Sequence, residues 1–148
     1  MTTPQLNPTI TFIMPIKGKQ ELLVEQISAV FNFSEIYDGF CEIVIVADET
    51  ISATDVTLRI AELAIKLGKI SHPHVRTKIV RSTSPLNIDG LIDIGMNYAL
   101  GQKMIVLTNT APNEMDLTHR SGLDSFGRNV LIADCLTGEN ALQEFLQK

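Results

Sequence analysis

The sequence predicts an α/β protein of three layers, in which helices cover both faces of an open, mostly parallel sheet of about five strands. Short apolar runs alternate along the chain with segments whose apolar residues recur at helical spacing, an order typical of parallel strands joined by crossover helices. The 148 residues are 45% hydrophobic and 20% charged, which is enough for a single core. No repeat or linker interrupts the pattern. We therefore expect one domain over residues 1–148, with residues 1–9 as a flexible N-terminal extension.

Two strands and a helix are predicted in the first third of the chain. The runs TFIMPI (11–16) and CEIVIVADE (41–49) are almost continuously apolar, as expected for strands that are covered on both faces. Between them, residues 19–33 show one apolar helical stripe. The residues of this stripe are Leu23, Ile27, Val30 and Phe31.

A second helix and a third strand follow. Residues 52–55 have the S-x-x-D form of a helix start, and apolar residues then recur at helical spacing until Gly68, which predicts the helix end. The recurring residues are Val56, Ile60, Leu63 and Leu67. In residues 74–82 apolar and charged side chains alternate, which favours a strand near an edge of the sheet.

The remaining chain predicts two more helices and two more strands. A helix is expected from Asn87 to Leu100, and strands are expected at 103–109 and 129–135. A closing helix is expected at 138–148. The stretch between the last two strands, residues 110–128, is polar and poorly periodic, so no regular element is predicted there.

Charge and cysteine usage exclude several classes of protein. Lys and Arg number 12 against 17 Asp and Glu, a formal net charge of −5, which disfavours a nucleic-acid-binding protein. No apolar run approaches the length of about 18 residues that a membrane span needs, and the start lacks a secretory pattern. Cys41 and Cys135 adjoin apolar runs without a CxxC partner, which predicts buried, reduced thiols. These observations favour a cytoplasmic protein.

The loops that follow the strands are the expected place for a ligand. In an open α/β sheet the ligand crevice lies beyond the carboxyl ends of the strands, where the strand order reverses. Residues 15–19, 47–50, 82–89 and 108–110 occupy these positions. The chain has neither GxGxxG nor GxxxxGK[ST], so no dinucleotide turn or P-loop is predicted. It also lacks the GxSxG and HExxH signatures.

Two of these loops carry a family resemblance. The stretch ITFIMPIKGKQELLVEQISAV resembles the opening of the inverting A-type glycosyltransferases related to dolichyl-phosphate mannose synthase and bacterial polysaccharide synthases. Pro15 matches the proline that ends the family's first strand, while Lys17 and Gly18 stand at its Tyr-Asn pair. EIVIVADET is similar to the second strand and its Asp-Asp-Gly-Ser ending, with Asp48 on the second aspartate and Thr50 on the serine.

The resemblance extends over about residues 10 to 111. The segment LIDIGMNYALGQ is similar to the family's Ala-Arg-Asn-x-Gly segment, with Gly95 on the glycine and Asp93 in place of the asparagine. MIVLTNT is similar to the strand that carries the family's Asp-x-Asp motif, where this chain has Thr108 and Thr110. The resemblance therefore implies a nucleotide-diphospho-sugar transferase-like fold and a nucleotide or nucleotide-sugar site. The implied site residues are Pro15, Lys17, Asp48, Thr50, Asp93, Thr108 and Thr110.

The departures from the family predict a domain that does not transfer a sugar. In the Asp-x-Asp motif two carboxylates hold a divalent cation against a diphosphate, and threonine hydroxyls are neutral. We therefore expect no resident metal, and a divalent cation only together with a nucleotide diphosphate. The family also uses a carboxylate base on an acceptor-binding half, and 148 residues are expected to leave no room for that half.

Each candidate residue also has a purely structural interpretation. Asp48 also suits a turn or helix cap, and Lys17 and Lys19 also suit a solvated helix start. Asp89 and Asp93 lie four residues apart on one helix face, which favours solvation over a metal or acid–base pair. The histidines of the segment HPH, His72 and His74, lack a third ligand nearby. His119 and Arg120 are candidates for a flap over the crevice, with disorder or an interface as the alternatives.

Three functional hypotheses remain open on the sequence. The first is a reduced, non-catalytic glycosyltransferase-like domain that binds a nucleotide weakly. The second is an interaction or assembly module, a homodimer for example, that keeps the fold for packing alone. The third is a small enzyme of different chemistry that uses Asp48, Asp89 or Asp93, although no nucleophile–base pair supports it.

Overall fold

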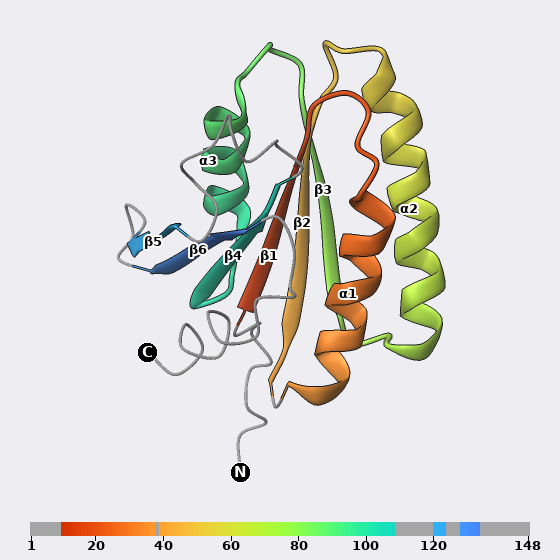
Figure 1. The fold of residues 1–148 in the computed structure, drawn as a ribbon, viewed down its shortest axis with the longest axis vertical. Coiled ribbons are helices and arrows are strands. Elements are labelled where there is room, and N and C mark those ends of the chain that lie inside the picture. The colour runs from red at the N-terminus through yellow and green to blue at the C-terminus, as the bar shows by residue number, and fades with distance from the viewer. Residues whose placement is uncertain (1–9, 38, 109–119, 124–127, 134–148) are drawn as a thin grey trace.

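A computed structural model describes residues 10–37, 39–108, 120–123 and 128–133 of the chain. Five features predicted from the sequence lie outside these residues: the extension 1–9, Thr110, His119, Cys135 and the closing helix 138–148. The described residues form an α/β fold that is built on one open sheet (Figure 1).

The sheet has six strands in the order β3-β2-β1-β4-β6-β5. Five of them are parallel, and β5 alone runs antiparallel, at the edge beside β6. The bounds are β1 Ile10–Ile16, β2 Cys41–Asp48, β3 Arg76–Ser82, β4 Lys103–Leu107, β5 Arg120–Leu123 and β6 Asn129–Ala133. The predicted open, mostly parallel sheet is therefore confirmed, and so is the position of residues 76–82 at an edge.

Strand β5 corrects the prediction that residues 110–128 contain no regular element. Its four residues pair with β6 from Arg120 opposite Ile132 to Leu123 opposite Asn129. The sequence RSGL is short and has no apolar alternation, so its own pattern carries no strand signal. The unpaired edge of β6 supplies the hydrogen-bonding groups that make it a strand.

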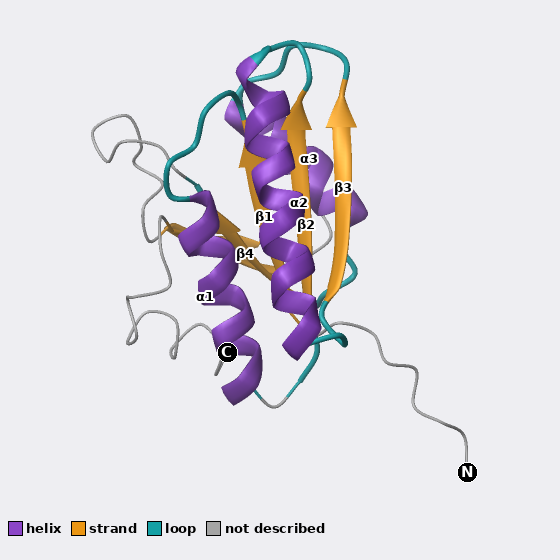
Figure 2. Ribbon diagram, turned by 90° about the vertical axis from the view of Figure 1, so that its right-hand side faces the viewer, coloured by secondary structure: helices purple, strands orange, loops and turns teal. Residues whose placement is uncertain are grey.

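The helices cover both faces of the sheet, which confirms the three layers. Helices α1 (Leu23–Ile36) and α2 (Ala53–Ser71) lie side by side on one face, and α3 (Ile88–Tyr98) lies on the other (Figure 2). The Asn87 side chain caps α3 by accepting a hydrogen bond from the Gly90 amide at 2.8 Å. No helix within the described residues is long and apolar enough to cross a membrane.

The core has two halves, one on each face of the sheet. The strands β1 and β2 are buried at every position, because successive side chains point to opposite faces and both faces are covered. In β1, Phe12 and Met14 face α1 and α2, whereas Ile13 faces α3. Helix α3 lies very close to the sheet at Gly95, where an added Cβ would come within 2.6 Å of Ile13.

Helix α2 differs from its predicted form in two respects. It continues through Gly68 to Ser71, so the prediction that Gly68 ends the helix is wrong. The apolar residues at helical spacing do not face the core, since Val56, Ile60, Leu63 and Leu67 are 47% to 61% exposed. The buried face instead carries smaller or more polar residues, namely Thr54, Thr57, Leu58, Ala61 and Ile65.

Candidate functional site

The strand order reverses beside β1, whose neighbours are β2 on one side and β4 on the other. Pairing of β1 with β2 continues to Ile16 opposite Ala47, whereas pairing with β4 ends at Ile13 opposite Val106. Pro15 follows two residues later, and it has no backbone N–H to donate to a neighbouring strand. The carboxyl ends of β1 and β4 therefore separate at the position where open α/β sheets bind ligands.

Asp48 is the last residue of β2 and is completely buried. Its Oδ1 accepts a hydrogen bond of 2.9 Å from the Thr50 amide and a short one from the Thr50 hydroxyl. Its Oδ2 is buried and has no partner of normal hydrogen-bond geometry among the described residues. The hydrogen bonds to Oδ1 thus stabilise the turn that was the structural alternative for Asp48. Oδ2 remains able to accept hydrogen bonds from a ligand.

The surroundings of Asp48 favour its ionised form. The hydrogen bond from the Thr50 hydroxyl lowers the pKa of Asp48 below its ordinary value, and burial works against this effect. The backbone amides of Thr50 and Leu86 and the positive charge of Lys17 lower the pKa further. The Leu86 amide therefore lies near the carboxylate without making a well-formed hydrogen bond to Oδ2. At neutral pH Asp48 is a buried carboxylate whose Oδ2 makes no well-formed hydrogen bond among the described residues.

The loop after β1 is held in place by two threonines of α2. The Gly18 amide donates to Thr54 Oγ1 at 2.8 Å, and the Thr57 hydroxyl donates to the Gly18 carbonyl at 2.9 Å. Gly18 has φ +84°, a left-handed conformation that favours glycine. These contacts fix the exposed Lys17 near the end of β2. The sequence interpretation missed both threonines, although hydroxyl side chains in the first turn of a helix are a signal for such contacts.

Pro15 and Thr108 occupy the expected places beside the reversal of strand order. Pro15 is buried within β1, and Thr108 follows β4 directly and is 2% exposed. The Thr108 carbonyl accepts a hydrogen bond of 3.1 Å from Gln26 Nε2, which ties α1 to the end of β4. Gln26 was not among the predicted residues, because a glutamine within an apolar helical stripe carries no recognisable sequence signal.

Lys17, Asp48 and Thr50 are the predicted residues that the structure clearly brings together. Asp93 is not one of them, since it is exposed on α3 while Leu91 and Gly95 face the sheet. Asp89 is exposed on the same helix. Lys19 is also exposed and lies 3.9 Å from Glu21, in agreement with a solvated helix start.

Histidine and cysteine form no metal centre in the part of the chain that the structure describes, where no three His, Cys, Asp or Glu side chains gather. His72 Nε2 lies 2.8 Å from Glu35 Oε1, so this histidine links α2 to α1. The Cys41 thiol is free and buried, and burial raises its pKa to about 12. The predicted buried thiol is confirmed for Cys41, and it is a poor nucleophile at neutral pH.

Comparison of the chain with models of known protein families, with characterised proteins and with solved structures finds no match. The candidate binding residues lie at the carboxyl edge of the sheet. These residues offer a buried carboxylate oxygen beside an exposed lysine, an arrangement that suits hydrogen-bond donors and an anion on the same ligand.

Proposed function

We propose that this chain is a non-catalytic, nucleotide-binding domain with a nucleotide-diphospho-sugar transferase-like fold, related to the A-type glycosyltransferases. The observation that carries the proposal is the buried Oδ2 of Asp48 at the end of β2, which makes no well-formed hydrogen bond among the described residues. Unpaired buried carboxylate oxygens are costly, so a ligand that donates hydrogen bonds to Oδ2 removes a cost that the free protein bears.

The two ends of a nucleotide match the two charged groups of the site. A ribose hydroxyl or a base N–H donates to Asp48, and the Lys17 ammonium lies near enough to lower the pKa of Asp48 and is exposed. Lys17 is thus free to neutralise a phosphate. Because Asp48 is completely buried, the groups that cover Oδ2 must move aside when the ligand binds. Weak binding is therefore expected.

The absence of sugar transfer is inferred from the residues that follow β4. Thr108 and Thr110 stand where the family carries its Asp-x-Asp carboxylates, and neutral hydroxyls are poor ligands for a divalent cation. In this proposal a cation arrives only with the diphosphate of the nucleotide.

Amide chemical shifts of the labelled chain test the nucleotide site. We expect uridine or guanosine diphosphate, with and without Mg²⁺, to shift the amides around Lys17, Asp48 and Leu86. The variant Asp48→Asn should abolish these shifts, and the exposed Asp93→Asn should retain them as a matched control. Saturating nucleotide that moves none of these amides would overturn the proposal, as would equal shifts in Asp48→Asn.

A second candidate function, an assembly module, is favoured by a separate observation. The outer face of α2 exposes a row of large apolar side chains, each of them 47% to 78% exposed. A contiguous apolar surface on a folded protein marks a contact with a partner. This face lies on α2, apart from the carboxylate of Asp48, so the two candidate functions are tested independently.

A further inference from the structure

The outer face of α2 carries five exposed apolar side chains, which we call the α2 stripe. Their exposed fractions run from 47% for Ile60 to 78% for Ile70. The members are Val56, Ile60, Leu63, Leu67 and Ile70. The stripe extends over almost the whole length of a 19-residue helix. It contributes nothing to the core described above, so its apolar character needs another explanation.

The spacing of the stripe is that of a helix-to-helix contact. Its members follow one another at steps of four, three, four and three residues, the repeat of 3.5 residues that forms a coiled-coil seam. An apolar face that only packs on a sheet is broader than this seam. The spacing therefore points to a second helix that lies along α2 over several turns.

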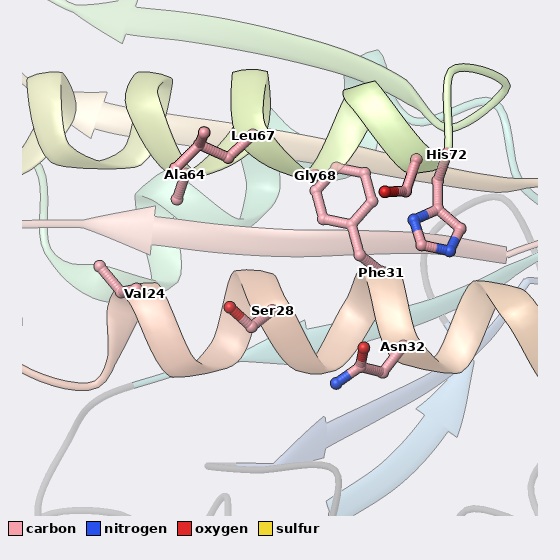
Figure 3. A pocket seen from close by; sticks show the side chains of 9 residues that line it. Val24, Ser28, Phe31, Asn32, Ala64, Leu67, Gly68 and His72 are labelled. Carbon is pink, nitrogen blue, oxygen red and sulfur yellow. The ribbon is translucent and has the colours of Figure 1, made fainter.

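A groove beside the stripe can receive side chains from that helix. It lies between α1 and α2, has a volume of about 240 Å³, and includes Leu67 of the stripe and Val24 of α1 in its lining (Figure 3). Ala64, Leu67 and Gly68 of α2 lie along its upper side in this view. A ridge of side chains on one helix packs into such a groove on another.

We propose that the α2 stripe binds the α2 stripe of a second copy of this chain, in a symmetric antiparallel pair. The steps of four, three and four residues from Val56 to Leu67 read the same in both directions. A two-fold axis between Ile60 and Leu63 therefore places each Ile60 opposite Leu63 of the second copy. The same axis places each Val56 opposite Leu67. A surface that is complementary to itself in this way is what an isologous dimer requires.

Charge and area agree with a second copy as the occupant. The chain has a net charge of −5, which opposes self-association. The flank of the stripe, however, carries both signs: Asp55, Arg59, Glu62, Lys66 and Lys69. Two such flanks do not face each other as surfaces of like charge. By the exposed fractions of its members the stripe presents on the order of several hundred Å² of apolar surface, which lies at the low end of interface sizes and fits a weak, reversible dimer.

The proposal deepens the assembly function and does not depend on the nucleotide site. Sedimentation of the full chain between about 1 µM and 1 mM tests it directly. We expect a dimer whose dissociation constant rises about 100-fold or more in Leu63→Lys, because the symmetric dimer then buries two unpaired ammonium groups. Leu100→Lys is the matched control. Leu100 is 49% exposed and lies on the connection after α3, so this variant should dimerise like the native chain.

Disulfide formation between engineered cysteines tests the antiparallel register. All chains in this test also carry Cys135→Ser, so that the native Cys135 thiol cannot cross-link. In the proposed pair Val56 lies opposite Leu67 of the second copy, and the two Val56 residues are about 16 Å apart along the helices. An equal mixture of Val56→Cys and Leu67→Cys should therefore cross-link, and neither variant should cross-link alone. Cross-linking of Val56→Cys by itself would overturn the antiparallel arrangement.

Each other outcome also decides the proposal. A native dimer that Leu63→Lys leaves intact would overturn this surface without touching the assembly function. A chain that stays monomeric throughout the concentration range would remove the surface and the homodimeric form of that function together. Binding of the monomer to vesicles of anionic phospholipid, lost in Leu63→Lys but not in Leu100→Lys, would assign the stripe to a membrane surface instead.

Discussion

Asp48 shows how one side chain at a strand end can serve structure and binding together. Its Oδ1 closes the turn toward α2 through the Thr50 amide and hydroxyl. Its Oδ2 is buried without a well-formed hydrogen bond, an arrangement that a fold optimised only for stability would avoid. Because Oδ1 stabilises the turn while Oδ2 makes no well-formed hydrogen bond, the same residue suits both a turn and a ligand site.

Replacement of Asp48 by asparagine should lower stability in a pH-dependent way. The asparagine side chain keeps an oxygen for Thr50 but loses the charge, so we expect a loss of about 1 kcal/mol at pH 7, the difference between charge-assisted and neutral hydrogen bonds. The pKa of Asp48 is lowered from 3.8 in the folded chain. The contribution of its charge is therefore complete well above pH 3.8, and it declines as the pH falls through the lower native value.

Urea unfolding of the native chain and of Asp48→Asn at pH 7 and pH 3 measures this dependence. The difference in the free energy of unfolding should be larger at pH 7. Asp93→Asn, at an exposed position, should show no such pH dependence. A difference for Asp48→Asn that grows toward pH 3 would contradict the lowered pKa.

At the scale of elements, periodicity identifies α2 correctly but assigns its inner face wrongly. Val56, Ile60 and Leu63 form the stronger apolar pattern, yet they are exposed. The face that packs against α1 and the sheet needs smaller side chains, such as Ala61, and hydroxyls that hold the loop after β1, such as Thr54. A sequence pattern records where apolar residues recur, and it does not record which partner covers them.

At Gly68 in α2, the space available for a side chain decides how a substitution changes stability. Alanine there would gain up to about 1 kcal/mol in helix propensity. Its Cβ, however, would lie within 2.3 to 2.7 Å of the Phe31 ring, which is only 4% exposed. Displacing a packed ring costs roughly 1–3 kcal/mol, so after the gain in helix propensity we expect Gly68→Ala to destabilise the chain by up to about 2 kcal/mol.

A double-mutant cycle with Phe31→Leu distinguishes this clash from a general effect of the substitution. The smaller, flexible leucine should relieve the contact, so that Gly68→Ala costs less in the Phe31→Leu background than in the native chain. Chemical denaturation of the four proteins measures the coupling. An equal cost in both backgrounds would show that the contact between α1 and α2 at Gly68 is not what limits stability.

At the scale of the whole molecule, the sequence predicts more of the site at the carboxyl ends of the strands than of the contacts at their amino ends. Asp48 and Lys17 are predictable because strand ends can be read from apolar runs, and parallel strands bring those ends to one edge. Thr54 and Gln26 are not, because their partners, Gly18 and Thr108, are 36 and 82 residues away in the chain. Such pairings depend on how helices seat against the sheet, which periodicity does not specify.

A buried polar network links the amino ends of β1, β2 and β3, and the sequence analysis did not predict it. Glu42 of β2 is completely buried, and its Oε1 accepts hydrogen bonds from the Thr11 hydroxyl at 2.8 Å and the Leu100 amide at 2.9 Å. Lys78 Nζ lies 3.0 Å from Oε2 as an ion pair without the geometry of a directed hydrogen bond. The Thr11 hydroxyl also accepts from the Gly101 amide at 2.9 Å. This network joins three strands to the connection after α3.

We expect the ion pair between Lys78 and Glu42 to contribute more to stability than an ordinary surface pair does. Lys78→Met leaves the buried Glu42 carboxylate without a cation. Removal of one partner of a buried pair costs about 3–5 kcal/mol, and because the Lys78 side chain is 34% exposed we expect a smaller loss, about 2 kcal/mol. The double variant Glu42→Gln/Lys78→Met should recover part of this loss. A glutamine keeps Oε1 for Thr11 and Leu100 and carries no charge.

Thermal and chemical unfolding of both variants and of Glu42→Gln alone measures the recovery, and nucleotide titration of each variant provides the control. The network lies at the amino edge and Asp48 at the carboxyl edge of the same strand. Stability should therefore change while the shifts around Lys17 and Asp48 persist. A double variant no more stable than Lys78→Met would show that the network is not held together by charge. Loss of the nucleotide shifts in a folded variant would show that the two edges of the sheet are coupled.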